Sequence, residues 1–275
     1  MRTRMVCLLV LLVLCAATIA HAAAPPIYYL ALGDSLAIGV QPSANGDVPT
    51  NQGYVDDLFA AFRTRIHGLE LAKLGCSGET STTMIQGGVC TYSQGSQLAA
   101  AVSFLETHQV AFVTIDIGAN DIDGCISSSG INQVCIETAL TTVGTNLPTI
   151  LTELRTVVGP NVPIIGMNYY DPFLAFWVLG TSGQALAKAS EQVALVFNGV
   201  LETAYQAFSA PVADVASAFR ITDFTIIPPI NLPVNVFLTL QWTWMGAPPP
   251  LGPDIHPNVV GYAVIAGAFA KRIVP

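Results

Sequence analysis

The amino-acid sequence predicts an α/β fold, a three-layer αβα sandwich around a central parallel sheet of about five strands. Short apolar runs rich in β-branched and aromatic residues alternate along the chain with longer segments of helical spacing. Strands that alternate with helices of this length indicate right-handed crossovers and a parallel sheet with helices on both faces. The strands are almost continuously apolar, as expected where both faces of a sheet are buried.

The predicted elements follow one another in a regular order. Strands are predicted at residues 27–32, 69–74, 111–117, 162–167 and 211–215. Helices are predicted at residues 54–65, 97–108, 136–157, 186–208 and 259–273. Residues 222–253 break this order, because they are rich in proline and in large apolar side chains. That region is too long for an ordinary connection, so it is either a structured insertion or a functional loop.

The N-terminus predicts export from the cell. Arg2 and Arg4 precede an apolar run, and Ala20-His21-Ala22 supplies the small-x-small pattern of a cleavage site. We therefore interpret residues 1–22 as a signal peptide cleaved near Ala22, and residues 23–275 as one secreted, extracellular domain. No later apolar run lasts for the ~20 residues that a membrane span needs, so no integral membrane association is expected.

The charge balance excludes some partners. The chain has 18 acidic and 10 basic residues, and loss of Arg2 and Arg4 with the signal peptide leaves 18 against 8, a net charge of −10. Such a surface repels nucleic acids and anionic membranes. Neither is expected as a partner, and we expect a monomer.

Four cysteines remain after the signal peptide. An even count in an exported chain indicates disulfides, and proximity favours Cys76–Cys90 and Cys125–Cys135 among the three possible pairings. A zinc site is the rival interpretation. It is disfavoured because no cysteine pair has the short spacing of zinc ligands and the nearest histidine is far away. No metal site is therefore predicted.

Histidine is scarce, which narrows the search for a general base. In a parallel α/β sheet, ligands bind beyond the carboxyl ends of the strands. His67 and His108 directly precede predicted strands and so lie at the opposite edge. His256, just before the last helix, can reach the carboxyl edge, and imidazole is the usual base for activating a hydroxyl. Taken alone, a histidine in this position is more often structural.

Three more residues follow predicted strands directly. Ser35 lies in residues 31–36 (ALGDSL) after the first strand, Gly78 lies in the loop after the second, and Asn120 comes after the third. Each has an ordinary structural explanation as a turn or N-cap residue, a disulfide-held loop, or an Asx-turn. Together they supply a hydroxyl nucleophile, a backbone N–H and an amide donor at one sheet edge.

This set of residues resembles the SGNH hydrolases, also called the GDSL esterase/lipase family. The family's motif blocks are an early Gly-Asp-Ser, a Gly-x-x-Gly loop, Gly-x-Asn-Asp and a late Asp-x-x-His, and the resemblance spans residues 28–274. It implies a flavodoxin-like sandwich, Ser35 as nucleophile and His256 as base. It also implies an oxyanion hole made of the Ser35 and Gly78 N–H groups and the Asn120 side chain. No cofactor is implied.

The fourth block departs from the family pattern. Pro253 stands three residues before His256, where the family has its acid, and the nearest carboxylate is Asp254, two residues before. Either Asp254 or a backbone carbonyl could orient the imidazole, since the third member of a triad mainly fixes the tautomer and stabilises the imidazolium. Both arrangements stay open at this point.

The resemblance implies a serine hydrolase that cleaves carboxylic esters of small molecules or lipids through an acyl-Ser35 intermediate. Apolar segments at 173–177 and 237–245 are placed to flank the site and favour an apolar acyl group over a sugar. A polysaccharide O-deacetylase of the same fold is one alternative. A secreted binding module without catalysis is another. The α/β-hydrolase fold is disfavoured because no Gly-x-Ser-x-Gly nucleophile elbow occurs.

Overall fold

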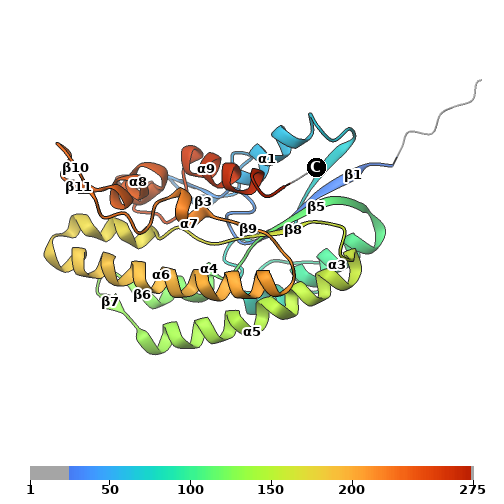
Figure 1. Cartoon of the computed structure of the whole chain (residues 1–275), viewed down its shortest axis with the longest axis horizontal. Helices are drawn as coiled ribbons and strands as arrows, with labels where there is room; N and C mark the ends of the chain where they lie inside the picture. The colour runs from blue at the N-terminus through green and yellow to red at the C-terminus, as the bar shows by residue number, and fades with distance from the viewer. Residues whose placement is uncertain (1–24, 274–275) are drawn as a thin grey trace, which may run out of the picture.

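The computed structural model describes residues 25–273, with a five-stranded parallel sheet at its centre (Figure 1). The sheet has the order β4-β1-β5-β8-β9. Its strands are β1 (Ile27–Gly33), β4 (Leu69–Lys73), β5 (Gln109–Asp116), β8 (Ile164–Met167) and β9 (Val212–Ala213), and every pairing is parallel. The predicted fold class is confirmed. The predicted signal peptide, residues 1–22, lies outside the described residues.

Long helices cover both faces of the sheet (Figure 1). One layer contains α1 (Tyr54–Phe62) and α9 (Val259–Ala270), and the other contains α3 (Gln97–Thr107), α5 (Gln133–Val158) and α6 (Thr181–Ala207). These are the five helices predicted from the sequence. α6 begins five residues earlier than predicted because its first turn is polar and carries no apolar periodicity.

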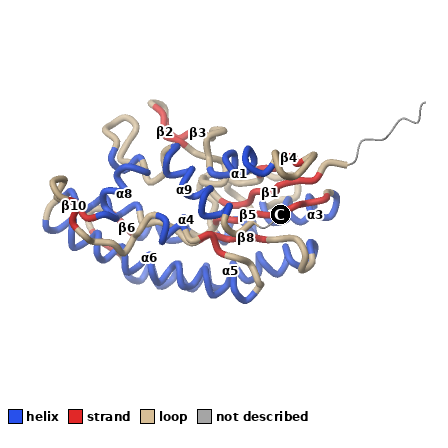
Figure 2. Tube along the Cα trace, turned by 45° about the horizontal axis from the view of Figure 1, so that its top comes forward, coloured by secondary structure: helices blue, strands red, loops and turns tan. Residues whose placement is uncertain are grey.

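Shorter elements connect the layers. They are the hairpin of β2 (Gln41–Ser43) and β3 (Gly46–Val48), then α2 (Ser81–Gln86), α4 (Ala119–Ile122), η1 (Asp123–Cys125), the hairpin of β6 (Ile126–Ser127) and β7 (Gly130–Ile131), η2 (Pro172–Leu179) and α7 (Val215–Ala218). The β2–β3 hairpin lies apart from the central sheet (Figure 2).

The proline-rich region 222–253 is folded rather than an open loop. It contains the short hairpin of β10 (Ile226–Ile227) and β11 (Leu232–Pro233), followed by α8 (Val234–Trp242) and η3 (Trp244–Gly246). Val236 is fully buried, and Trp242 packs edge-on against Phe219. Of the two alternatives for this region, the structure therefore shows a structured insertion.

Both predicted disulfides are present. Cys76–Cys90 fastens the loop after β4, and Cys125–Cys135 ties η1 to the first turn of α5. Each bridge therefore restrains a segment that follows the carboxyl end of a sheet strand.

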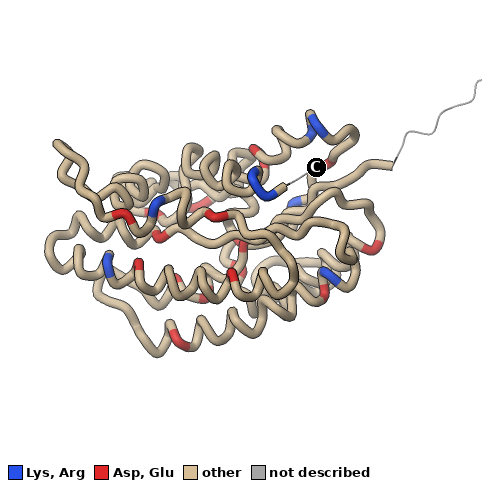
Figure 3. The backbone as a smooth tube through the Cα atoms, viewed as in Figure 1, with Lys and Arg blue, Asp and Glu red and all other residues tan. Residues whose placement is uncertain are grey.

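Basic side chains are few on the folded domain. Figure 3 shows them dispersed between more numerous acidic positions, with no basic stripe in this view. Within residues 25–273, no helix combines the length and apolarity needed to cross a bilayer.

At the end of β1, just before Ser35, the backbone of β1 passes very close to the backbone of β5. Gly33 has a φ of 136°, a backbone conformation that residues with a Cβ rarely adopt. A Cβ at this position would lie 2.1 Å from the carbonyl oxygen of Asp116 on β5. Only glycine therefore lets β1 turn here while it stays paired with β5.

Replacing Gly33 by Ala should lower the free energy of unfolding by about 3 kcal/mol or more, because backbone strain and a backbone clash add. Urea denaturation followed by circular dichroism measures this. Gly267→Ala is the matched control, since its Cβ would meet nothing within 4 Å on an exposed face of α9. That change should raise stability by about 0.5–1 kcal/mol. Wild-type stability of Gly33→Ala would contradict the packing described here.

Candidate active site

Three of the predicted site residues share one cleft at the carboxyl edge of the sheet. Ser35 follows β1, Asn120 lies on α4 after β5, and His256 precedes α9, and all three line the cleft. Ser35 and His256 are each 7% exposed. The cleft lining does not include Gly78. The fold thus gathers the nucleophile, base and amide candidates from distant parts of the chain.

The turn that carries Ser35 is held by buried side chains. The Gln97 amide on α3 binds both backbone groups of Gly33, accepting from its N–H at 2.7 Å and donating to its carbonyl at 2.9 Å. The Asp116 carboxylate at the end of β5 accepts from the Asp34 N–H at 3.2 Å and from the Tyr54 hydroxyl. Burial raises the pKa of Asp116 well above its usual range, and the nearby charge of Asp34 raises it further.

The Asp34 carboxylate closes the same turn from the other side. It is 1% exposed and accepts a hydrogen bond from the Leu36 N–H at 2.9 Å. This bond from residue i to i+2 is an Asx-turn, which fixes the backbone on both sides of Ser35. The Ser35 hydroxyl is therefore presented from a rigid corner.

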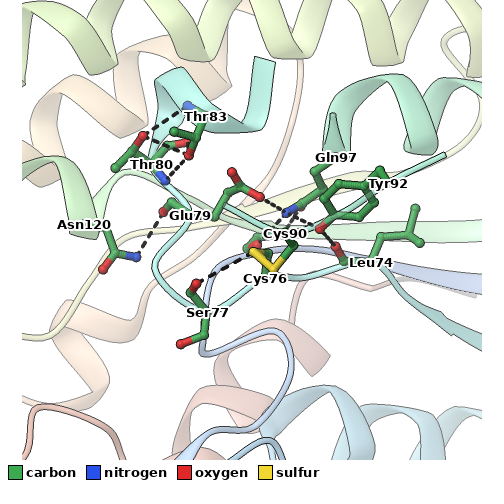
Figure 4. Close-up of a disulfide and its surroundings, with 11 residues drawn as sticks. Leu74, Cys76, Ser77, Glu79, Thr80, Thr83, Cys90, Tyr92, Gln97 and Asn120 are labelled. Atoms are coloured by element: carbon green, nitrogen blue, oxygen red, sulfur yellow. Dashed lines mark hydrogen bonds between the residues drawn. A yellow bond between two sulfur atoms is a disulfide. The ribbon is translucent and has the colours of Figure 1, made fainter. Parts of the chain in front are cut away.

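Asn120 is joined to the loop that contains Gly78. Its side-chain nitrogen donates to the Glu79 carbonyl at 3.0 Å, and this bond is visible in Figure 4. The second N–H of the amide makes no hydrogen bond within the described chain, and Asn120 lines the cleft. One amide can thus hold the neighbouring loop and still offer a donor toward a bound group.

Side-chain contacts and a disulfide hold the loop that contains Gly78 in place (Figure 4). Gly78 has φ of 80° in the turn between Cys76 and Glu79, whose backbone groups bond at 3.1 Å. Buried Glu79 accepts from the Gln97 side chain at 3.0 Å, so the residue that clamps Gly33 also supports this loop. The Cys76–Cys90 disulfide adds a covalent restraint.

Asp254 reaches the imidazole despite its shifted position in the sequence. Its Oδ1 lies 2.7 Å from Nδ1 of His256 and also accepts the His256 backbone N–H at 2.9 Å. The same oxygen therefore closes an Asx-turn and orients the ring, which an acid two residues upstream can do. Of the two alternatives left by the sequence, the geometry favours the carboxylate over a backbone carbonyl.

The Asp254–His256 pair shifts the pKa of each partner. Burial alone lowers the pKa of His256, but the hydrogen bond and charge of Asp254, together with the charges of Asp47 and Asp34, outweigh it, so the pKa is raised above its ordinary value. Burial alone raises the pKa of Asp254, but the hydrogen bonds and charge of His256, with a smaller contribution from Asp47, outweigh it, so that pKa is lowered. The carboxylate therefore favours the imidazolium that forms when the ring accepts a proton.

A second carboxylate near the ring was not predicted. Asp47, on the β2–β3 hairpin, lies 3.8 Å from Nδ1 of His256, and its charge also raises the pKa of His256. No sequence signal could identify it, because Asp47 lies in the short strand β3 and is brought close only by the tertiary fold. Asp47, Asp254 and His256 place potential metal-binding atoms within 4.8 Å, but Nδ1 is already engaged with Asp254.

The folded insertion anchors the loop that carries His256. The Trp244 N–H donates to the His256 carbonyl at 2.9 Å, and the Trp244 carbonyl accepts from the Asp254 N–H at 3.2 Å. The Asn258 N–H binds the Trp242 carbonyl at 2.9 Å, directly before α9 begins. The end of region 222–253 thus positions both the base candidate and its acid.

The cleft walls are mainly apolar, with acidic groups among them. Apolar and aromatic lining comes from α4, η2, α6 and the loop before η2, and it includes Ile122, Tyr170, Phe173, Val193 and Phe197. Phe173 belongs to the first of the two apolar segments expected to flank the site. The second segment, residues 237–245, contributes no residue to this lining, although its Trp244 binds the loop that carries His256. Within this segment, Trp242 packs against Phe219, and the Trp244 ring N–H donates to the Gln41 side chain at 2.7 Å.

Asp254→Asn should lower the pKa of His256, because burial would remain while the opposing charge is removed. The change can be measured by NMR titration of the imidazole resonances, assigned with a His256→Gln variant. Asp57→Asn, an exposed position on α1, is the control and should leave the titration unchanged. An unchanged His256 pKa in Asp254→Asn would show that Asp254 does not orient the ring in solution.

Several solved structures share the fold. Phospholipase A1 from Streptomyces albidoflavus NA297 matches with 18% identity and a TM-score of 0.55, covering 90% of this chain and 99% of that chain. An extracellular lipase from Streptomyces rimosus matches with 16% identity and a TM-score of 0.57, covering 89% and 99%. A catalytic mutant of Axe2, an acetylxylan esterase from Geobacillus stearothermophilus, matches with 17% identity and a TM-score of 0.52, covering 90% and 94%. No curated protein matches the chain.

The family assignment rests on the sequence as well. The model of the GDSL-like lipase/acylhydrolase family matches residues 31–264, a span that begins just before Ser35 and includes His256. The match covers most of the chain, including every residue that lines the cleft. The chain therefore belongs to the GDSL-like lipase/acylhydrolase family.

Proposed function

We propose that this chain is a serine hydrolase that cleaves carboxylic esters through an acyl-Ser35 intermediate. The family and the fold support a hydrolase of ester substrates. The observation that carries the finer proposal is the cleft shared by Ser35, Asn120 and His256, with the Asp254 carboxylate 2.7 Å from Nδ1 of the imidazole. These are the groups that nucleophilic acyl transfer requires.

In the proposed first step, Nε2 of His256 takes the Ser35 proton as Oγ attacks the ester carbonyl. Asp254 holds the tautomer that leaves Nε2 unprotonated and stabilises the imidazolium. The imidazolium then protonates the departing alcohol. Water, deprotonated by the same imidazole, then attacks the acyl-enzyme. The tetrahedral intermediate that forms breaks down to release the acid and restore Ser35.

The proposed oxyanion hole has three donors, the N–H groups of Ser35 and Gly78 and the free N–H of Asn120. Support comes from the bond between Asn120 and the Glu79 carbonyl, which holds the Gly78 loop beside the amide. Preorganised donors of this kind stabilise charge that develops in the transition state. Gly78 lies outside the cleft lining, so its part in the proposal rests on this loop contact.

The apolar walls favour esters with an apolar acyl or alcohol portion, bound next to Ser35. Secretion is a further part of the proposal. It rests on the signal-like N-terminal sequence and on the two disulfides, which suit an oxidising compartment. We also propose that the released chain acts as a monomer.

Ser35→Ala and His256→Ala should each lower kcat for nitrophenyl esters by about 10⁴-fold or more, because each removes a group that acts as part of one unit. A panel of esters from acetate to palmitate measures both activity and acyl preference. Ser93→Ala, at an exposed position, is the matched control and should keep wild-type kcat. Full turnover by Ser35→Ala would rule out the acyl-serine mechanism.

Asn120→Ala should lower kcat by about 10²-fold or more, with a smaller change in KM, because the lost donor acts mainly on the transition state. The control is Asn146→Ala on α5. Asn146 also braces a nearby element, donating to Ser81 at 3.1 Å and Thr82 at 3.0 Å, but it does not line the cleft. Equal losses of kcat in the two variants would indicate that Asn120 acts only by holding a loop.

A further inference from the structure

One carboxyl group in the cleft has no hydrogen-bond or ion-pair partner among the described residues. Asp123 follows Asn120 by three residues, at the junction of α4 and η1, and lines the same cleft. Within residues 25–273, neither of its carboxyl oxygens makes a hydrogen bond or an ion pair. The other acids of the lining differ in this respect. Asp34 accepts from Leu36, and Asp171 accepts from the Ser190 hydroxyl at 2.7 Å and the Phe173 N–H at 2.9 Å.

The surroundings of Asp123 disfavour its charged form. Burial raises the pKa of Asp123 to about 7, with further contributions from the charges of Asp34 and Asp171 and an opposing one from His256. None of the described Lys or Arg residues lines the cleft. Near neutral pH the group therefore exists both as a carboxylic acid and as a carboxylate.

The Asp123 side chain is partly exposed, so water can solvate its carboxyl group from the cleft. A substrate that fills the cleft displaces this water, which favours a substrate that supplies a hydrogen-bond partner in its place. A hydroxyl suits both forms of Asp123, since it donates to the carboxylate and can accept from the acid. An ammonium group would suit only the carboxylate, and the apolar walls add a cost for burying a second charge.

We propose that Asp123 determines specificity by binding a hydroxyl group of the substrate, so that the preferred substrates are hydroxylated esters. The inference rests on the proposed function. Residues three apart on a helix face the same side, about one turn or ~5 Å along the axis. Because Asn120 faces the oxyanion, the hydroxyl bound by Asp123 lies within a few bonds of the ester carbonyl, on either the acyl or the alcohol portion.

The test compares kcat/KM for two pairs of matched esters. Nitrophenyl 3-hydroxybutyrate against nitrophenyl isovalerate places the hydroxyl on the acyl portion. 2-Hydroxyethyl butyrate against propyl butyrate places it on the alcohol portion. The wild-type enzyme should prefer the hydroxylated ester in at least one pair by about 10-fold to 100-fold, the range for a hydrogen bond to a charged group. The pair that shows the preference identifies the portion that carries the hydroxyl.

Asp123→Leu should abolish this preference and speed hydrolysis of the plain ester, because an apolar wall replaces the unmatched carboxyl. Asp57→Asn removes the same charge from an exposed position and should keep the preference.

If Asp123→Leu does not fold, Asp123→Asn provides the second comparison. The quantity to follow is the wild-type kcat/KM for nitrophenyl isovalerate divided by the kcat/KM of Asp123→Asn for the same ester. This ratio should fall as pH rises through about 7, because Asp123 ionises there and its charged form suits an apolar ester less. Asp34, Asp171 and His256 remain in both proteins, so their own ionisation contributes to both the numerator and the denominator of this ratio.

Equal rates within both ester pairs, or a preference that survives in Asp123→Leu, would overturn the proposal. So would an Asp123-dependent preference for butyrylcholine over 3,3-dimethylbutyl butyrate in place of the hydroxyl preference, because it would assign the group to a cation. Failure of the proposed function gives a different result, in which the wild-type chain hydrolyses none of these esters.

Discussion

The hydrogen-bonded turn at the end of β1 is the constraint on which the rest of the site depends. Gly33 passes so close to Asp116 that no side chain fits, and Gln97 binds both of its backbone groups. Because these contacts are buried, the direction in which Ser35 leaves the sheet is set by the core and not by the surface loops. Gln97 also supports Glu79, which couples the nucleophile turn to the loop beside Asn120.

A separate set of hydrogen bonds positions His256. Its loop is short, and backbone bonds from Trp244 attach it to the folded insertion. Within that loop, one carboxylate oxygen of Asp254 serves both the backbone and the ring of His256. Two rigid parts from opposite ends of the sequence therefore meet across one cleft, which is the arrangement that proximity catalysis needs.

Most of the fold could be predicted from the sequence, because buried parallel strands and long amphipathic helices leave strong periodic signals. The residues after each strand could be predicted too, since the sheet edge follows from strand order. The contact between Asp254 and His256 could not, because it depends on the turn between them. Asp47 and Asp123 were missed for a related reason: only tertiary structure brings Asp47 to the imidazole and leaves Asp123 unpartnered in the cleft.

The central claim is that the rigid corner after β1 presents Ser35 as a nucleophile activated by His256. The most direct measurement is mass spectrometry of the folded chain after reaction with a fluorophosphonate, with peptide mapping of the adduct. The account predicts one adduct per chain, located on Ser35, and its loss in His256→Ala. An unlabelled wild-type chain, or an adduct on another serine, would contradict it.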